Sequence, residues 1–168
     1  MRFIKLVFIS LLLLFLLITG IGLLFPSTVK VSRTVNVLAP TDSVFRMLND
    51  VKYWKLWMQG ADTNTVQFLS PQTAGKGTIA KVGTGEVKIT YSSADSIISY
   101  WSSEKGNVQK SGFIIVPSQP NSTVVNWYFQ QDLGWYPWER FGSFANDKIL
   151  GPVMEQSLDK LKKILEKN

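Results

Sequence analysis

The chain has 168 residues, with 18 lysines and arginines and 12 aspartates and glutamates, so its formal net charge at pH 7 is +6. It contains no histidine and no cysteine, which excludes disulfides, Ser-His and Cys-His nucleophiles and the usual zinc ligands. We therefore expect no metal and no cofactor, and any acid-base chemistry would fall to Asp, Glu, Lys or Tyr.

The basic residues do not form the concentrated footprint that nucleic-acid binding requires. The densest group, Lys160, Lys162, Lys163 and Lys167, is interspersed with Asp159 and Glu166, as on a solvated helix face. We expect no nucleic-acid partner.

The first element is a run of twenty uncharged residues, from Leu6 to Phe25. A helix of that length spans the roughly 30 Å hydrocarbon core of a bilayer. The run predicts a transmembrane helix within an N-terminal signal anchor, residues 1–28. A cleaved signal peptide is the alternative, because Arg2 and Lys5 form a short positive segment, but the run is too long and no small-x-small cleavage site follows it.

The remaining residues, 29–168, form one domain. The positive-inside rule slightly favours a cytoplasmic N-terminus, which would place this domain on the extracytoplasmic side of the membrane. We expect the membrane, contacted through residues 6–25, as one partner, whereas protein partners cannot be named from the sequence.

The domain begins with an alternating strand, Val29 to Leu38. Thr41 and Asp42 are expected to cap a helix that ends near Leu48, and a second short helix follows from Val51 to about Trp57. The hydrophobic period then changes to two, and turn signals separate six further strands, which argues for an antiparallel meander. These strands are Thr65 to Leu69, Thr78 to Val82, Gly85 to Ser92, Ser96 to Ser103, Asn107 to Val116 and Thr123 to Gln131.

The last element is a long amphipathic helix, Trp138 to Lys167, which the sheet could grip. Gly151-Pro152 lies inside it and predicts a kink near Leu150 without a clean break. We expect the first half, with Phe144 and Lys148, to border a cavity and the second half to pack permanently on the sheet.

Several motifs carry a resemblance to a known family. They are Val35 to Phe45 (VNVLAPTDSVF) with Leu48-Asn49-Asp50 and Tyr53 to Trp57, then Gly83-Thr84-Gly85 leading into Glu86 to Tyr91, and finally Phe141 to Phe144 with Lys148 to Pro152. With the element order, they resemble the START-like (SRPBCC) superfamily, in its membrane-anchored branch of polyketide cyclase, dehydrase and lipid transport proteins.

The resemblance implies an α+β helix-grip fold, a curved seven-stranded antiparallel sheet around the C-terminal helix. It also implies a hydrophobic cavity for a lipid, sterol or polyketide-like ligand. The superfamily includes enzymes, transporters and chaperone cofactors, so membership does not select a function. In this chain Met58 to Asp62 replaces a longer loop of the branch, which changes the expected shape of the pocket mouth.

Large rings on the strands and the short helix either line that cavity or fill a solid core, and both alternatives remain open. The candidate lining residues are Trp54, Trp57, Tyr91, Trp101, Phe113, Trp127, Phe129, Phe144 and Lys148.

A second group of rings, Trp135, Tyr136 and Trp138, precedes the last helix. Three interpretations are open: a gate over the cavity, a contact with the membrane interface, where Trp and Tyr concentrate, or a packed aromatic corner.

The resemblance, the aromatic content of the strands and the lack of histidine and cysteine together favour a membrane-anchored module that binds or transfers a hydrophobic small molecule or lipid without catalysis. The first alternative is a cyclase or dehydratase, for which Glu86 and Lys88 are the least implausible participants. Strand alternation argues against them, because it turns Val87, Ile89 and Tyr91 inward and the charged pair outward. The second alternative is a ligand-free protein-interaction module with a filled core.

Overall fold

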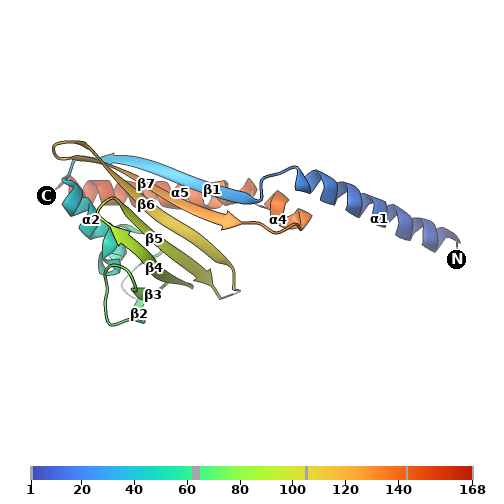
Figure 1. Cartoon of the computed structure of the whole chain (residues 1–168), viewed down its shortest axis with the longest axis horizontal. Coiled ribbons are helices and arrows are strands. Elements are labelled where there is room, and N and C mark those ends of the chain that lie inside the picture. The colour runs from blue at the N-terminus through green and yellow to red at the C-terminus, as the bar shows by residue number, and fades with distance from the viewer. Residues whose placement is uncertain (1, 62–64, 105, 143, 168) are drawn as a thin grey trace.

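The computed structural model describes residues 2–61, 65–104, 106–142 and 144–167. A long helix, α1 (Arg2–Leu23), extends away from an α+β domain, and the C-terminal helix α5 (Phe144–Leu165) lies along the sheet (Figure 1). The other elements are β1 (Thr28–Val37), α2 (Thr41–Asn49), a 3₁₀ turn η1 (Val51–Tyr53), α3 (Trp54–Trp57), β2 (Val66–Phe68), β3 (Ile79–Val82), β4 (Gly85–Ser93), β5 (Ser96–Ser103), β6 (Val108–Gln119), β7 (Ser122–Asp132) and α4 (Pro137–Gly142).

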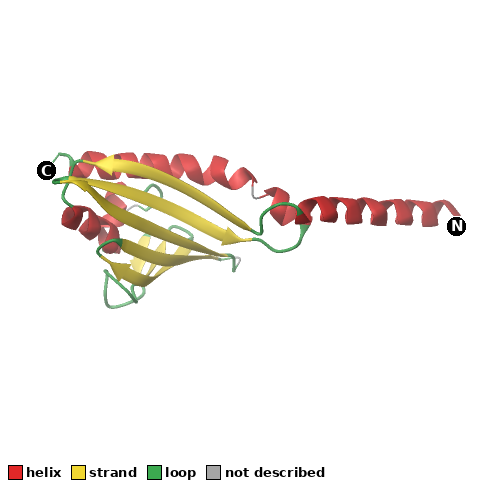
Figure 2. Cartoon of the chain, turned by 45° about the horizontal axis from the view of Figure 1, so that its top comes forward, coloured by secondary structure: helices red, strands yellow, loops and turns green. Residues whose placement is uncertain are grey.

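The seven strands form one antiparallel sheet in the order β1-β7-β6-β5-β4-β3-β2. The meander of successive hairpins therefore runs from β2 to β7, and the first strand returns to pair with the last one. The sheet curves around α5, with the short helices α2 and α3 at the end of the domain opposite α1 (Figure 2). This is the helix-grip fold that the sequence predicts.

One local prediction about a helix end was wrong. The residue at the N-cap of α2 is Pro40, and no side chain caps the helix. The Thr41 hydroxyl instead lies 3.3 Å from the hydroxyl of Thr123 on β7, so it joins the helix start to the sheet. The C-terminal segment is helical over α4 and α5 on both sides of residue 143, which lies outside the described residues, and α5 continues through Pro152.

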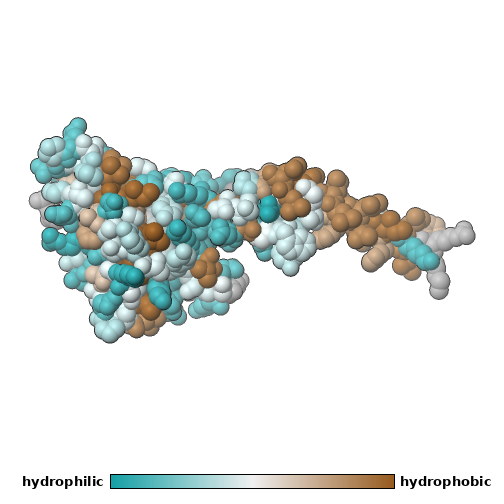
Figure 3. All heavy atoms as spheres, in the orientation of Figure 1, coloured by the Kyte–Doolittle hydropathy of each residue, from teal (hydrophilic) through white to brown (hydrophobic). Residues whose placement is uncertain are grey.

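The helix α1 is apolar along almost its whole length. Phe3–Leu23 has a mean hydropathy of 2.9 and is nearly all exposed, and by length and composition it could cross a membrane. In Figure 3 its surface is brown, whereas most of the visible domain surface is teal or white. The helix thus begins before the predicted run, which starts at Leu6, and ends two residues before Phe25.

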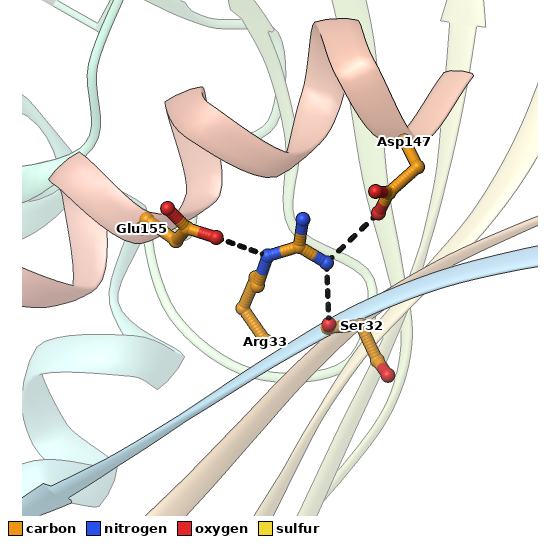
Figure 4. A network of polar contacts seen from close by, with 4 residues as sticks. All are labelled: Ser32, Arg33, Asp147 and Glu155. Carbon is orange, nitrogen blue, oxygen red and sulfur yellow. Dashed lines mark hydrogen bonds and ion pairs between the residues drawn. The ribbon is translucent and has the colours of Figure 1, made fainter. Parts of the chain in front are cut away.

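Arg33 clamps β1 to α5. It occupies a position in phase with the inward-facing Val31 and Val37, so its side chain points toward α5 and not toward solvent. Its guanidinium lies between two carboxylates, with Nη1 2.9 Å from Asp147 Oδ1 and Nε 2.5 Å from Glu155 Oε1 (Figure 4). Hydrogen bonds to these carboxylates, Asp147 first, raise the pKa of Arg33 above its ordinary value.

Gly151 makes room for this clamp. Asp147, Gly151 and Glu155 are spaced four residues apart and therefore share one face of α5. A Cβ added at Gly151 would lie only 2.1 Å from Arg33 Nη2 and 2.9 Å from its Cζ. The glycine inside the helix is thus explained by the arginine that crosses it.

The substitution Gly151→Ala tests this explanation. In the native chain it should lower the free energy of unfolding by about 1 kcal/mol, because the guanidinium must leave both carboxylates. In an Arg33→Ala background the same substitution should instead stabilise the protein by up to about 1 kcal/mol, since alanine favours a helix over glycine. Urea unfolding of the four proteins of this cycle measures both effects, and an equal effect in both backgrounds would contradict the clamp.

Candidate functional site

The inward-facing side chains of the sheet form rows that run across the strands. The row nearest α1 contains Val29, Gln131, Gln109, Trp101 and Val87. The second row contains Val31, Phe129, Ser111, Ser99 and Ile89. The third contains Arg33, Trp127, Phe113 and Ile97, and the fourth contains Val35, Val125 and Ile115. Polar amides therefore occur at the α1 end of the inner face, and large rings lie behind them.

The middle of the grip is filled by rings. Trp54 and Trp57 on α3 are fully buried, and Trp57 meets Phe113 and Trp127 edge-on, with centroids 6.0 and 5.9 Å apart. Phe113 and Trp127 stack at 5.3 Å. The Trp127 indole donates a hydrogen bond to Ser111 Oγ, so its polar edge is satisfied inside the core. At this depth the rings form a solid core.

Trp101 and Phe129 are only partly buried and mark the transition from this core to the α1 end. Trp101 stacks on Trp54 with centroids 5.9 Å apart, and its centroid lies 6.0 Å from that of Phe129. Trp101 lies in the first row beside Gln109, and Phe129 lies in the second row. They form an apolar floor beneath the amides.

Three amides meet above this floor. Gln109 Nε2 on β6 donates to Gln131 Oε1 on β7 at 3.1 Å, and Asn146 Nδ2 on α5 donates to the same oxygen at 3.4 Å. All three residues are partly buried. The neutral amides of Gln109, Gln131 and Asn146 thus bridge the sheet and α5. We call these three residues the amide row.

Two pockets adjoin the amide row. One, of about 330 Å³, lies by the β3–β4 and β5–β6 turns and is bordered by Trp101 and Gln109. The other, of about 10 Å³, lies between β1, β7 and α5. Together with the amide row and its apolar floor they form the candidate site, which we call the mouth.

A larger pocket, of about 600 Å³, lies at the opposite end of the domain. It is formed by the β1–α2 connection, α2 and the end of α5, and includes Arg46 and Leu165. It is outside the grip, and the sequence analysis did not indicate it.

The structure separates the predicted lining residues into groups. Trp54, Trp57, Phe113 and Trp127 lie in the solid core, and Trp101 and Phe129 lie at the mouth. Lys148 is exposed on α5, and the side chain of Phe144 lies outside the described residues.

The prediction that Tyr91 faces inward was wrong. A register shift between Ile89 and Tyr91 pairs Tyr91 with Ile98, which turns the ring to the outer face, where it is 49% exposed. Glu86 and Lys88 precede the shift and are exposed as the alternation predicts. The charged pair therefore lies outside the grip.

Sequence reasoning missed Gln109, Gln131, Asn146 and Arg33. The signal for three of them was present, because Gln109, Gln131 and Arg33 occupy the same alternation phase as their buried neighbours. The sequence analysis assigned these polar residues no role, whereas they mark where the inner face changes in polarity.

A comparison with models of protein families shows which family the chain belongs to. Residues 28–166 match the model of the family described as polyketide cyclase / dehydrase and lipid transport. The chain belongs to this family. The match covers the domain from the start of β1 to the end of α5 and excludes α1.

Solved structures with the same fold include three of different kinds. DynU16, a protein in the dynemicin biosynthetic locus, is 19% identical with a TM-score of 0.60 over 82% of this chain, which spans only 47% of DynU16. Norcoclaurine synthase from Thalictrum flavum is 15% identical, with a TM-score of 0.65 over 82% of this chain and 94% of the enzyme. A START superfamily protein from Mycobacterium smegmatis is 17% identical, with a TM-score of 0.61 over 82% and 97%.

At these identities the likenesses establish the fold and no activity. A search of curated protein sequences finds no match to this chain. The comparisons establish the family and the fold, and the function depends on the chemistry of the site.

Two tryptophan substitutions distinguish the core from the mouth. Trp127→Ala should lower the free energy of unfolding by about 3–5 kcal/mol, because it leaves a cavity and an unpaired Ser111. Trp101→Ala should cost only about 1–2 kcal/mol and should increase the acrylamide quenching of Trp54, which it uncovers. Urea unfolding and quenching of the full chain in detergent measure both effects, and equal destabilisation would contradict the division.

Proposed function

We propose that the chain is a membrane-anchored module that binds or transfers an amphipathic lipid or hydrophobic small molecule through the mouth. The polar end of the ligand contacts the amide row, and its apolar part contacts Trp101 and Phe129. The domain lies on the extracytoplasmic side, with α1 as the anchor.

The observation that carries this proposal is the change in polarity along the inner face. Gln109 and Gln131 lie in the row nearest α1 together with Trp101, and the rows behind contain the rings of Phe129, Trp127 and Phe113. A site that binds an amphipathic molecule needs this combination of a largely apolar surface and a few convergent polar groups. The pocket of about 330 Å³ beside Trp101 and Gln109 is within the roughly 300–1,000 Å³ typical of ligand sites.

Binding is favoured over catalysis by the chemistry of the described lining residues. The polar side chains that meet at the amide row are neutral amides, which hydrogen-bond a ligand but do not exchange protons near neutral pH. Glu86 and Lys88, the candidates for an acid-base pair, are exposed on the outer face of the sheet. The proposal therefore rests on recognition and not on a reaction.

The position of the mouth supports exchange with a membrane. Thr28 pairs with Asp132 at the strand ends next to α1, and Val29 pairs with Gln131 one residue further in. The amide row thus lies close to the residue where the chain leaves α1. A ligand could pass between the bilayer and the mouth over a short distance.

The double variant Gln109→Leu/Gln131→Leu tests the role of the amides. Native mass spectrometry of the full chain, released from detergent micelles, would compare lauric acid, dodecanol and dodecyl methyl ether, which share a chain length. The native protein should retain the acid and the alcohol more than the ether. The double variant should lose this preference by about tenfold, as expected for one or two hydrogen bonds, and should still retain the ether.

Gln67→Leu/Gln156→Leu provides the matched control, because both glutamines are exposed outside the mouth. It should preserve the preference of the native protein. Retention of none of the three ligands by the native chain would contradict binding, and an unchanged preference in the mouth variant would contradict the role of the amide row.

A further inference from the structure

The segment after β7 returns to the end of α1. Leu133 N donates to Ser27 O at 2.7 Å, and a Cβ added at the buried Gly22 would lie 3.5 Å from Pro137 Cα. Gly22 therefore allows close packing of α1 against the start of α4. The apolar helix is joined to the domain by this packing as well as by the chain itself.

Arg140 joins the end of α1 to the segment after β7 with hydrogen bonds. Its side chain is largely buried, with the residue only 8% exposed. Nη1 donates to Phe25 O at 2.5 Å and to Gly22 O at 3.5 Å, and Nε donates to Gly134 O at 3.0 Å. Gly22 O, in the last turn of α1, also accepts a hydrogen bond from Phe25 N at 3.1 Å, and a positive charge at the C-terminal end of a helix is favourable. Arg140 thus supplies the C-terminal cap of α1 from the domain.

Three large rings surround this junction on its exposed side. Trp135, Tyr136 and Trp138 are 52%, 39% and 61% exposed. Their rings lie against one another, with centroids 4.4 Å apart for Trp135 and Tyr136 and 4.7 Å apart for Tyr136 and Trp138. These three adjacent rings are exposed, in contrast to the buried rings of the core. We call Trp135, Tyr136 and Trp138 the ring triplet.

We propose that the ring triplet lies in the headgroup layer of the same membrane that α1 crosses, and that Arg140 holds it there. The inference rests on the proposed function in one respect, because both need α1 to span a bilayer. Phe3–Leu23 has 21 residues, which span roughly 32 Å as a helix. Its end therefore reaches the edge of a hydrocarbon core about 30 Å thick. The residues beside that end lie where Trp and Tyr are enriched in membrane proteins.

The consequence is a fixed orientation of the domain. A single helix followed by a short connection would let the domain tilt, whereas the triplet and Arg140 add two further constraints. The mouth is then held facing the bilayer. The alternative that the rings gate the mouth is not supported by the described pockets, because the triplet does not border the pocket at Trp101 or the one at Gln131.

Quenching of tryptophan fluorescence tests the lipid contact. The full chain would be reconstituted in phosphatidylcholine vesicles with bromine atoms on the acyl chains near the headgroups. The native protein should be quenched by up to about one third, since two of its six tryptophans are in the triplet. Trp135→Phe/Trp138→Phe should remove this quenching, and the control Trp101→Phe should raise the quenched fraction. Equal quenching of the native chain and the double variant would overturn the proposal.

Hydrogen exchange tests the role of Arg140. In the same vesicles, Arg140→Gln should speed exchange of the amides of residues 22–27 several-fold, and Arg140→Lys should have a smaller effect because it keeps the charge. Arg46→Gln, at the other end of the domain, is the control and should leave these amides unchanged. Unchanged exchange in Arg140→Gln would overturn its role as a cap.

The outcomes can be separated from those of the ligand experiment. If an alkaline wash extracts the chain from the vesicles, both the membrane anchor and the contact of the rings with lipid are contradicted. A chain that stays in the membrane, shows the quenching and retains no apolar ligand would support the ring contact and contradict the proposed function.

Discussion

The packing of six rings between the sheet, α3 and α5, four of them buried and two partly buried, is the interaction on which the rest of the structure depends. Neighbouring centroids lie 5.3 to 6.4 Å apart, and the indole N–H groups of Trp54, Trp57 and Trp127 donate to Leu48 O, Met47 O and Ser111 Oγ. The rings therefore fill the space inside the curved sheet and leave no polar edge unsatisfied among these three. The same bonds tie α3 to α2 and β7 to β6. Within the described part of the grip, the solid core leaves the mouth at the α1 end as the candidate ligand site.

The element order and most boundaries could be predicted from the sequence, because they depend on local periodicity. Alternation predicted the first strand and the change from a period of 3.6 to a period of two predicted the other six, of which Ser96–Ser103 was predicted to the residue. The sequence indicated Trp101, Phe113, Trp127 and Phe129 as candidate lining residues on the strands, but it could not distinguish a lined cavity from a filled core. That distinction depends on volume, which is set by how closely α3 approaches the sheet.

The features that could not be predicted depend on a partner distant in the sequence. Tyr91 faces outward because of a register shift against β5. The Thr41 hydroxyl bonds to Thr123 and does not cap its own helix. Arg33 and Gly151 explain each other only once β1 lies on α5, and the amide row forms only when β6, β7 and α5 meet. In each case the local pattern gives the position of the residue and the tertiary contact gives its role.

The distance between the two ends of the domain bears on where a membrane-derived ligand would bind. The pocket of about 600 Å³ near Leu38 and Leu165 lies at the far end of β1, and ten strand residues span roughly 33 Å. A lipid whose tail is still in the bilayer could not reach that pocket under the proposed anchoring. The mouth, in contrast, lies one residue inside the strand end that follows α1. A smaller site at this end of the domain is therefore better placed for exchange with a membrane than the larger pocket.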